Sequence, residues 1–147
     1  MSNRRFTRVL RSLATGCCGL GLFLAAGCGG PQHYAPSSTK NAPGADPGIT
    51  VEVSKETHMA RVTIDIPNLA PPDRLAAGGS TFVAWYRRDE TMPWQRIGAL
   101  AYDETERRGR LGATVPEIAF DLEVSVETGA AAGAPSTTLV TKQHVSN

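Results

Sequence analysis

One residue of this chain has surroundings that predict its chemistry. This residue is Cys28, a thiol placed directly after the small residues Ala25, Ala26 and Gly27. Four arginines and no acidic residue stand at the start of the chain, and residues 12–27 are uncharged and mostly apolar. That run is shorter than the roughly 20 residues that a helix needs to cross a bilayer core. A basic start, a short apolar run and small residues before a cut are typical of a secretory signal, which the mature protein lacks.

The segment Leu24-Ala25-Ala26-Gly27-Cys28 resembles the signal of a bacterial lipoprotein, whose motif, the lipobox, ends in small residues and a cysteine. The resemblance implies that residues 1–27 are a signal peptide, that the Cys28 thiol receives a diacylglyceryl group and that the new amino terminus is acylated. Several acyl chains would hold the protein on a membrane, because a single chain binds only marginally. Gly29 after the cysteine resembles the outer-membrane address of many Gram-negative bacteria. We therefore expect a lipid-anchored protein of the bacterial cell envelope.

Other interpretations of the leader stay open. A similar motif ends at Cys17, but Arg8 and Arg11 would interrupt its apolar stretch, which favours Cys28. An ordinary cleaved signal or an uncleaved anchor helix would use the same apolar run without any lipid on Cys28.

Removal of the leader changes the charge and the thiol content of the remaining chain. The leader takes four of the 15 basic residues and none of the 14 acidic ones, which leaves a net charge of −3 instead of +1. Nucleic-acid binding needs a positive field along one face, so we expect no nucleic-acid partner. Cys17 and Cys18 leave with the leader and Cys28 would be a thioether. We therefore expect neither a disulfide nor a cysteine-based metal site.

Composition divides the rest of the chain into two regions. Residues 28–48 begin with the acylated cysteine, are rich in Pro and Gly, and hold no aliphatic side chain larger than Ala. Such a composition cannot build a core, so we expect a disordered tether there. Residues 49–147 are the predicted folded domain.

The folded region alternates apolar and polar residues with a period of two. Successive side chains of a strand point to opposite faces, so this alternation predicts half-buried strands. Residues 81–87 are apolar on both faces, which suits a central strand, whereas the last segment is polar enough for an edge. The predicted strands cover residues 49–54, 60–66, 81–87, 95–102, 109–115, 120–127 and 137–145.

About seven short strands with turn signals between them predict an all-β fold, an antiparallel immunoglobulin-like sandwich. No window has convincing helical periodicity. Pro71 and Pro72 allow only a short turn of helix within residues 69–77.

A set of strand and turn residues between Val62 and Val140 resembles the extracytoplasmic sandwich of anti-sigma-K factors. The matching segments are Asn68-Leu69-Ala70-Pro71-Pro72, Phe82-Val83-Ala84-Trp85, Pro93, Gly98, residues 120–127, and Pro135 before Thr138-Leu139-Val140. The resemblance implies an immunoglobulin-like domain in the bacterial envelope. Sigma-factor binding does not carry over, because the chain has neither the sigma-binding segment nor the transmembrane helix of that family, and a fold by itself does not define a function.

The histidines and serines form no pattern that predicts catalysis. His33, His58 and His144 lack the spacing of metal ligands, and no serine has the surroundings of a nucleophile elbow. We therefore expect no metal and no cofactor.

Charged residues cluster at two places. Asp121, Glu123 and Glu127 share one strand face, where paired carboxylates could do acid–base work or bind calcium. We interpret them instead as a solvated face. An acidic turn at residues 103–106 is followed by arginines at 107, 108 and 110, which we expect to pair locally or to protect a strand edge.

Two tryptophans remain. Trp85 lies inside the predicted central strand, where we expect it to fill the core. Trp94 follows Met92 and Pro93 in a predicted loop. An exposed Trp94 could stack on a sugar or anchor a partner protein, with Tyr102 as a second candidate for the same ligand. The alternative is that Trp94 forms a lid over the end of the sandwich.

These observations favour a lipid-anchored, non-catalytic interaction or structural module that contacts another envelope protein. The first alternative is a carbohydrate- or peptidoglycan-binding module that uses Trp94. A weaker alternative is a small hydrolase, which would require a buried acid or base with a shifted pKa in a cleft.

Overall fold

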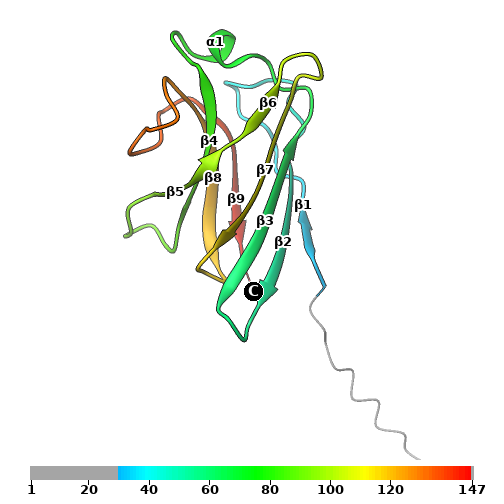
Figure 1. Cartoon of the computed structure of the whole chain (residues 1–147), viewed down its shortest axis with the longest axis vertical. Helices are drawn as coiled ribbons and strands as arrows, with labels where there is room; N and C mark the ends of the chain where they lie inside the picture. The colour runs from blue at the N-terminus through cyan, green and yellow to red at the C-terminus, as the bar shows by residue number, and fades with distance from the viewer. Residues whose placement is uncertain (1–29, 147) are drawn as a thin grey trace, which may run out of the picture.

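A computed structural model describes residues 30–146, so the leader and Cys28 lie outside the described residues. The described part is nearly all β (Figure 1). Its elements in chain order are β1 (Gln32–Tyr34), β2 (Gly48–Ser54), β3 (Met59–Ile66), α1 (Pro72–Leu75), β4 (Thr81–Arg87), β5 (Gln95–Ala99), β6 (Ala101–Asp103), β7 (Arg108–Val115), β8 (Phe120–Glu127) and β9 (Leu139–Val145).

The strands form two antiparallel sheets. One sheet has five strands in the order β1-β2-β3-β7-β6, and the other has four in the order β5-β4-β8-β9. The runs β2-β3-β7-β6 and β4-β8-β9 follow the ABED and CFG orders of the immunoglobulin sandwich. The predicted fold class is therefore confirmed. The predicted central position of residues 81–87 is also confirmed, and so is the edge position of the last strand.

The core lies between the two sheets and consists of the inward side chains of each strand. In β3, buried and outward residues alternate as the period of two predicts, with Val62, Ile64 and Ile66 facing inward. Phe82 and Phe120 contribute aromatic rings to the core from opposite ends of the four-stranded sheet. Helix α1 is one short turn after Pro71, as expected, because a proline is tolerated only at a helix start.

The predicted strand 95–102 is divided by a change of sheet. Residues 95–99 form β5 beside β4, whereas residues 101–103 form β6 beside β7. Leu100 lies between them, is 5% exposed, and donates its backbone N–H to the carbonyl of Phe82 at 2.9 Å. The chain crosses from one sheet to the other here. The alternation of apolar and polar residues does not predict such a crossing, because it shows only which side chains of a strand are buried.

Residues 30–48 are part of the sandwich, so the prediction of a free tether is wrong for this range. Strand β1 pairs with β2, Ser38 forms a bridge with Thr141, and the N–H of Thr39 donates to the carbonyl of Val140 at 2.9 Å. Ala42 and Ala45 are buried. The lack of large aliphatic side chains does not prevent folding here, because backbone hydrogen bonds need no such side chain and small residues allow close packing.

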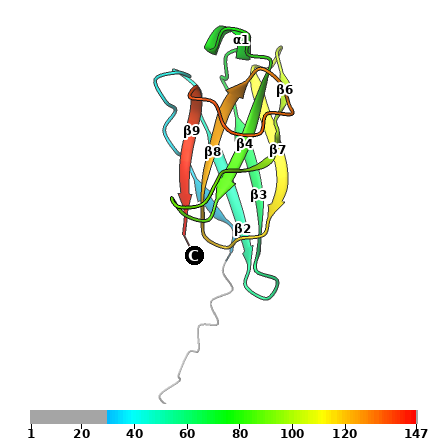
Figure 2. The ribbon, with the colours of Figure 1, turned by 90° about the vertical axis from the view of Figure 1, so that its left-hand side faces the viewer.

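The two ends of the sandwich differ. At one end lie α1, the β6–β7 turn and the β8–β9 segment. At the other end lie the turns at residues 55–58, 88–94 and 116–119, together with the end of β9 (Figures 1 and 2). We call this second end the entry end, because β1 runs away from it and the described chain begins near it.

Candidate functional site

A concavity of about 300 Å³ opens on the outer face of the four-stranded sheet, near the entry end. Cross-strand register places its side chains in two rows, because residues opposite one another on paired strands share a face. One row joins Arg87, Asp121 and His144, and the next joins Glu123 and Lys142. The complete lining is Arg87, Glu90, Trp94, Asp121, Leu122, Glu123, Lys142, Gln143 and His144.

Asp121 is the centre of the first row. The Nε of Arg87 donates to Oδ2 of Asp121 at 3.1 Å, and Nδ1 of His144 donates to Oδ1 at 2.8 Å. The hydrogen bond from His144 lowers the pKa of the Asp121 carboxyl, and the bond from Arg87 adds to this effect against the opposing effect of burial. Asp121 is therefore a fixed carboxylate with both oxygens engaged.

Trp94 lies at the edge of this row, in the turn before β5. Its ring is partly buried, and the guanidinium carbon of Arg87 lies 4.5 Å from the ring centroid. This geometry is a cation–π contact. The contact occupies one face of the indole, so Trp94 forms part of a polar wall and is not a free aromatic platform on that side.

Glu123 forms the floor of the second row. The residue is only 5% exposed, and burial raises the pKa of its carboxyl, although Lys142 and Arg87 oppose that effect. Neither cation forms an ion pair with Glu123 among the described residues. The shared strand face of Asp121, Glu123 and Glu127 is confirmed, but Glu123 and Glu127 are buried there rather than solvated.

The burial of this outer face comes from the segment between β8 and β9. Figure 2 shows this segment crossing the outer face of β8 and β4. The N–H of Ser136 donates to Oε1 of Glu127 at 2.8 Å, which holds the segment in place. Trp85 is fully buried on the outward face of β4, where its indole N–H donates to the hydroxyl of Ser125. The prediction that Trp85 fills the inter-sheet core is wrong: the side chain is buried, but on the outward face of the sheet, because its place in β4 alternates with the core residues Ala84 and Tyr86.

The structure does not bring Tyr102 to Trp94. Tyr102 lies on β6 in the other sheet, where its ring packs against Phe82 with the centroids 5.3 Å apart. Its hydroxyl donates to the carbonyl of Leu69 at 2.9 Å. Both the ring and the hydroxyl thus serve the fold, and Tyr102 leaves the candidate site.

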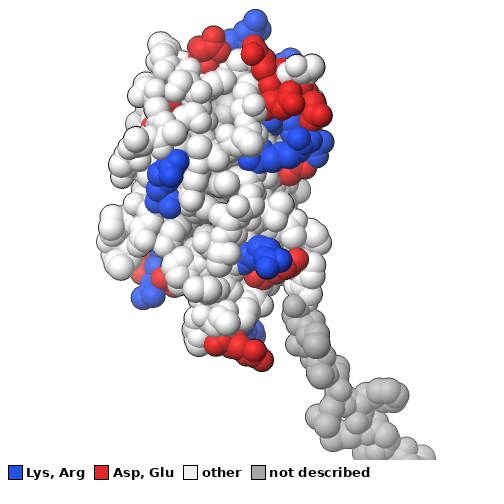
Figure 3. Space-filling model, viewed as in Figure 1, with Lys and Arg blue, Asp and Glu red and all other residues white. Residues whose placement is uncertain are grey.

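The charged cluster at the far end forms ion pairs both within itself and with β3. Figure 3 shows charged side chains gathered at this end of the viewed face, near the β6–β7 turn. Arg108 forms a bidentate pair with Asp65, and this contact lowers the pKa of the Asp65 carboxyl. Arg110 pairs with Glu106 at 2.7 Å. These arginines therefore hold neighbouring turns and strands together.

Trp94 is predictable from the sequence as a candidate binding residue, but most of the residues that line the concavity beside it are not. Arg87 and His144 lie 34 and 23 residues from Asp121 in the sequence, and only strand pairing brings them together. The one available signal was the alternation in residues 120–127, which places Asp121 and Glu123 on the same strand face.

Residues 30–146 contain no group of three or more histidine, cysteine or acidic residues that could hold a metal ion. The same range has no helix that is long and apolar enough to span a bilayer. No model of a known protein family matches the chain, and no curated protein matches it significantly.

Proposed function

We propose that this chain is a lipid-anchored, non-catalytic binding module of the bacterial envelope. Cys28 carries the lipid, and the concavity beside Trp94 contacts another envelope protein. The observation that carries the proposal is the preformed row of Trp94, Arg87, Asp121 and His144, which presents an aromatic ring and fixed charges on an open sheet face. Tryptophan and arginine are the residue types that are enriched where binding energy concentrates.

The anchor and the binding face are tested separately. Mass spectrometry of the membrane-extracted protein should find Cys28 as a thioether at the new amino terminus, and a free thiol there would reject the anchor. For the face, the full chain is isolated from native membranes with its bound proteins, beside Trp94→Ala and the control Arg96→Ala. Arg96 is exposed on β5 and does not line the concavity. A partner lost from Trp94→Ala and retained by Arg96→Ala supports the proposal, whereas equal retention by both rejects it.

A second candidate is binding of a cell-wall glycan at the same concavity. It is favoured by the lining, which sets an indole beside carboxylate, amide and cationic groups, the kinds of group that can hydrogen-bond sugar hydroxyls. Retention on purified cell-wall glycan that is lost in Trp94→Ala supports this candidate. No retention of the intact protein rejects it.

The burial of Glu123 is relevant to the alternative that the protein is a small hydrolase. It is a buried acid with a raised pKa in a concavity, which is the feature that this alternative requires. Asp121, however, has both oxygens engaged by Arg87 and His144. We therefore rank binding above hydrolysis. Release of soluble sugar from cell-wall glycan by the wild type, abolished in Glu123→Gln, would reverse this order.

A further inference from the structure

We propose that the tip of the β2–β3 hairpin rests on the lipid surface that anchors Cys28. The tip is the turn at residues 55–58 with Ser54 and Met59 on either side. This inference depends on the lipid anchor of the proposed function. It does not depend on the concavity beside Trp94.

The connection between the acylated cysteine and the sandwich is short. Only residues 29, 30 and 31 separate Cys28 from Gln32, the first residue of β1. Four peptide units span at most about 14 Å. A tether of twenty residues would have allowed the domain to lie far from the membrane. The pairing of β1 with β2 removes most of that length.

The chain that leads to β1 comes from the side of the hairpin tip. Gln32 pairs with Val51 in an antiparallel register, so the chain before Gln32 heads toward Ser54 and the hairpin tip. Ser54 is three residues beyond Val51, about 10 Å at the rise of a β-strand. The tip therefore projects past Gln32 by most of the distance that the connection can span. With the strands pointing at the membrane, a fully extended connection carries Cys28 at most a few ångströms past the tip, so the tip stays close to the lipid surface.

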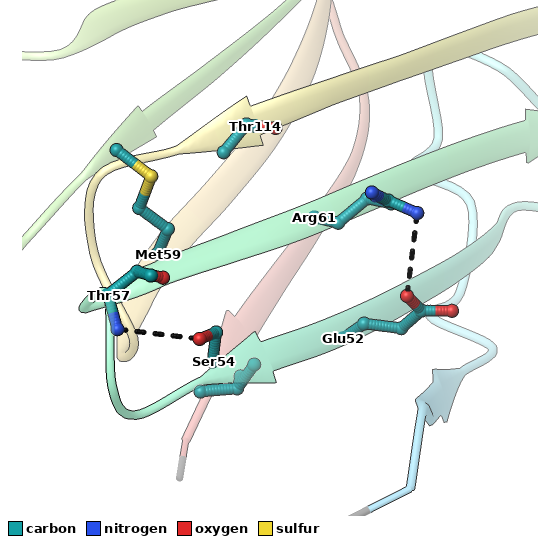
Figure 4. Close-up of a pocket in the computed structure, with 7 residues that line it drawn as sticks. Glu52, Ser54, Thr57, Met59, Arg61 and Thr114 are labelled. Carbon is teal, nitrogen blue, oxygen red and sulfur yellow. Dashed lines mark hydrogen bonds and ion pairs between the residues drawn. The ribbon is translucent and has the colours of Figure 1, made fainter.

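The surface of the entry end carries exposed apolar side chains. The exposed large apolar side chains among residues 30–146 are Met59 and Met92, at 45% and 42% exposure, and both belong to the entry end. Met59, Thr57 and Thr114 line a shallow hollow of about 420 Å³ on the hairpin. Figure 4 shows Met59 beside Thr57. The ion pair between Glu52 and Arg61, 3.9 Å apart, lies farther along the strands.

The charge of the tip indicates which lipids matter. The positive charge of Lys55 and the negative charge of Glu56 cancel, and His58 is the third titratable residue of the turn. A tip without net charge gains little from anionic lipids, whose attraction depends on clusters of basic residues. We therefore expect the contact to be the same on phosphatidylcholine alone and on mixtures that contain phosphatidylglycerol.

The test uses single cysteines in the full, processed lipoprotein on phosphatidylcholine nanodiscs. Met59→Cys and Thr57→Cys probe the tip, and Thr105→Cys is the control in the exposed β6–β7 turn at the far end. A bulky water-soluble maleimide measures accessibility, normalised to the same variant in detergent. We expect labelling at positions 57 and 59 to be about tenfold slower than at position 105, because acyl anchoring holds the tip at the interface.

A linker variant separates distance from local shielding. Twelve Gly and Ser residues inserted between Gly30 and Pro31 should restore rapid labelling at positions 57 and 59. The same insertion after Gly133, in the β8–β9 segment, should leave their labelling slow. Equal labelling at positions 57, 59 and 105 in a protein acylated on Cys28 would overturn the docking alone. An unmodified Cys28 thiol would overturn the anchor, and the docking with it.

Discussion

The indole nitrogen of Trp85 donates a 2.8 Å hydrogen bond to the hydroxyl of Ser125, and both residues are fully buried on the outward face of the four-stranded sheet. Ser125 in turn donates to Glu127, which accepts the backbone N–H of Ser136. This chain of hydrogen bonds closes the β8–β9 segment over the sheet. The bulky side chain of the central strand is thus covered from outside the sandwich.

Replacement of Ser125 by alanine should destabilise the protein by about 1–3 kcal/mol, because a buried indole N–H and the Glu127 carboxylate each lose a partner. Chemical denaturation of the two proteins measures the difference. The matched control is Ser54→Ala, an exposed serine on β2, for which we expect a change within about 0.5 kcal/mol. An equal effect of both substitutions would contradict the role of this chain of bonds.

The pKa of Asp121 predicts a loss of stability in acid. Its folded pKa lies below the unfolded value of about 3.9. The stabilisation is therefore present above that value and disappears as the pH falls through the folded pKa. Asp121→Asn should lower stability near pH 7 by up to about 1 kcal/mol and flatten the decline of melting temperature as the pH falls below about 4. Asp73→Asn, on exposed α1, should leave the profile unchanged.

Glu123 should behave in the opposite sense. Its raised folded pKa means that burial favours the neutral acid. This contribution is complete below the unfolded value of about 4.3 and is lost as the pH rises through the folded pKa. Glu123→Gln should therefore raise the melting temperature at pH 8 and change it little at pH 4. Glu104→Gln, in an exposed turn, is the control. A stabilisation of the same size at both pH values would argue against the burial of a charge.

Gly79 should not tolerate a side chain. A Cβ there would lie 2.4 Å from the carbonyl oxygen of Pro72 and 2.7 Å from Cγ1 of Val126. The oxygen belongs to the backbone and cannot turn away, so Gly79→Ala should cost about 1–3 kcal/mol. Gly112→Ala meets no atom within 4 Å and serves as the matched control. Thermal denaturation of the two variants should separate them clearly; coincident curves would contradict the close approach of α1 and β8.

The packing of residues 30–48 predicts an effect far from the predicted domain boundary. Ala42 is 2% exposed, so Ala42→Asp would bury a charge and should destabilise the whole sandwich by at least about 1–3 kcal/mol. Ala131→Asp, in the exposed β8–β9 segment, should be nearly neutral. Hydrogen exchange adds a second measurement, because β1 amides that pair with β2 should be protected. Rapid exchange throughout residues 32–48 would restore the interpretation of a free tether.

The sequence by itself determined the all-β class, the approximate bounds of six of the seven predicted strands and the brevity of α1. Alternation reports which faces of a strand are buried, and prolines limit a helix locally. The tertiary structure alone decided the change of sheet at Leu100, the packing of residues 30–48, the outward position of Trp85 and the meeting of Arg87, Asp121 and His144. Each of these depends on the pairing of strands that are distant in the chain. A local period of two shows that a face is covered, but it does not show which segment covers it.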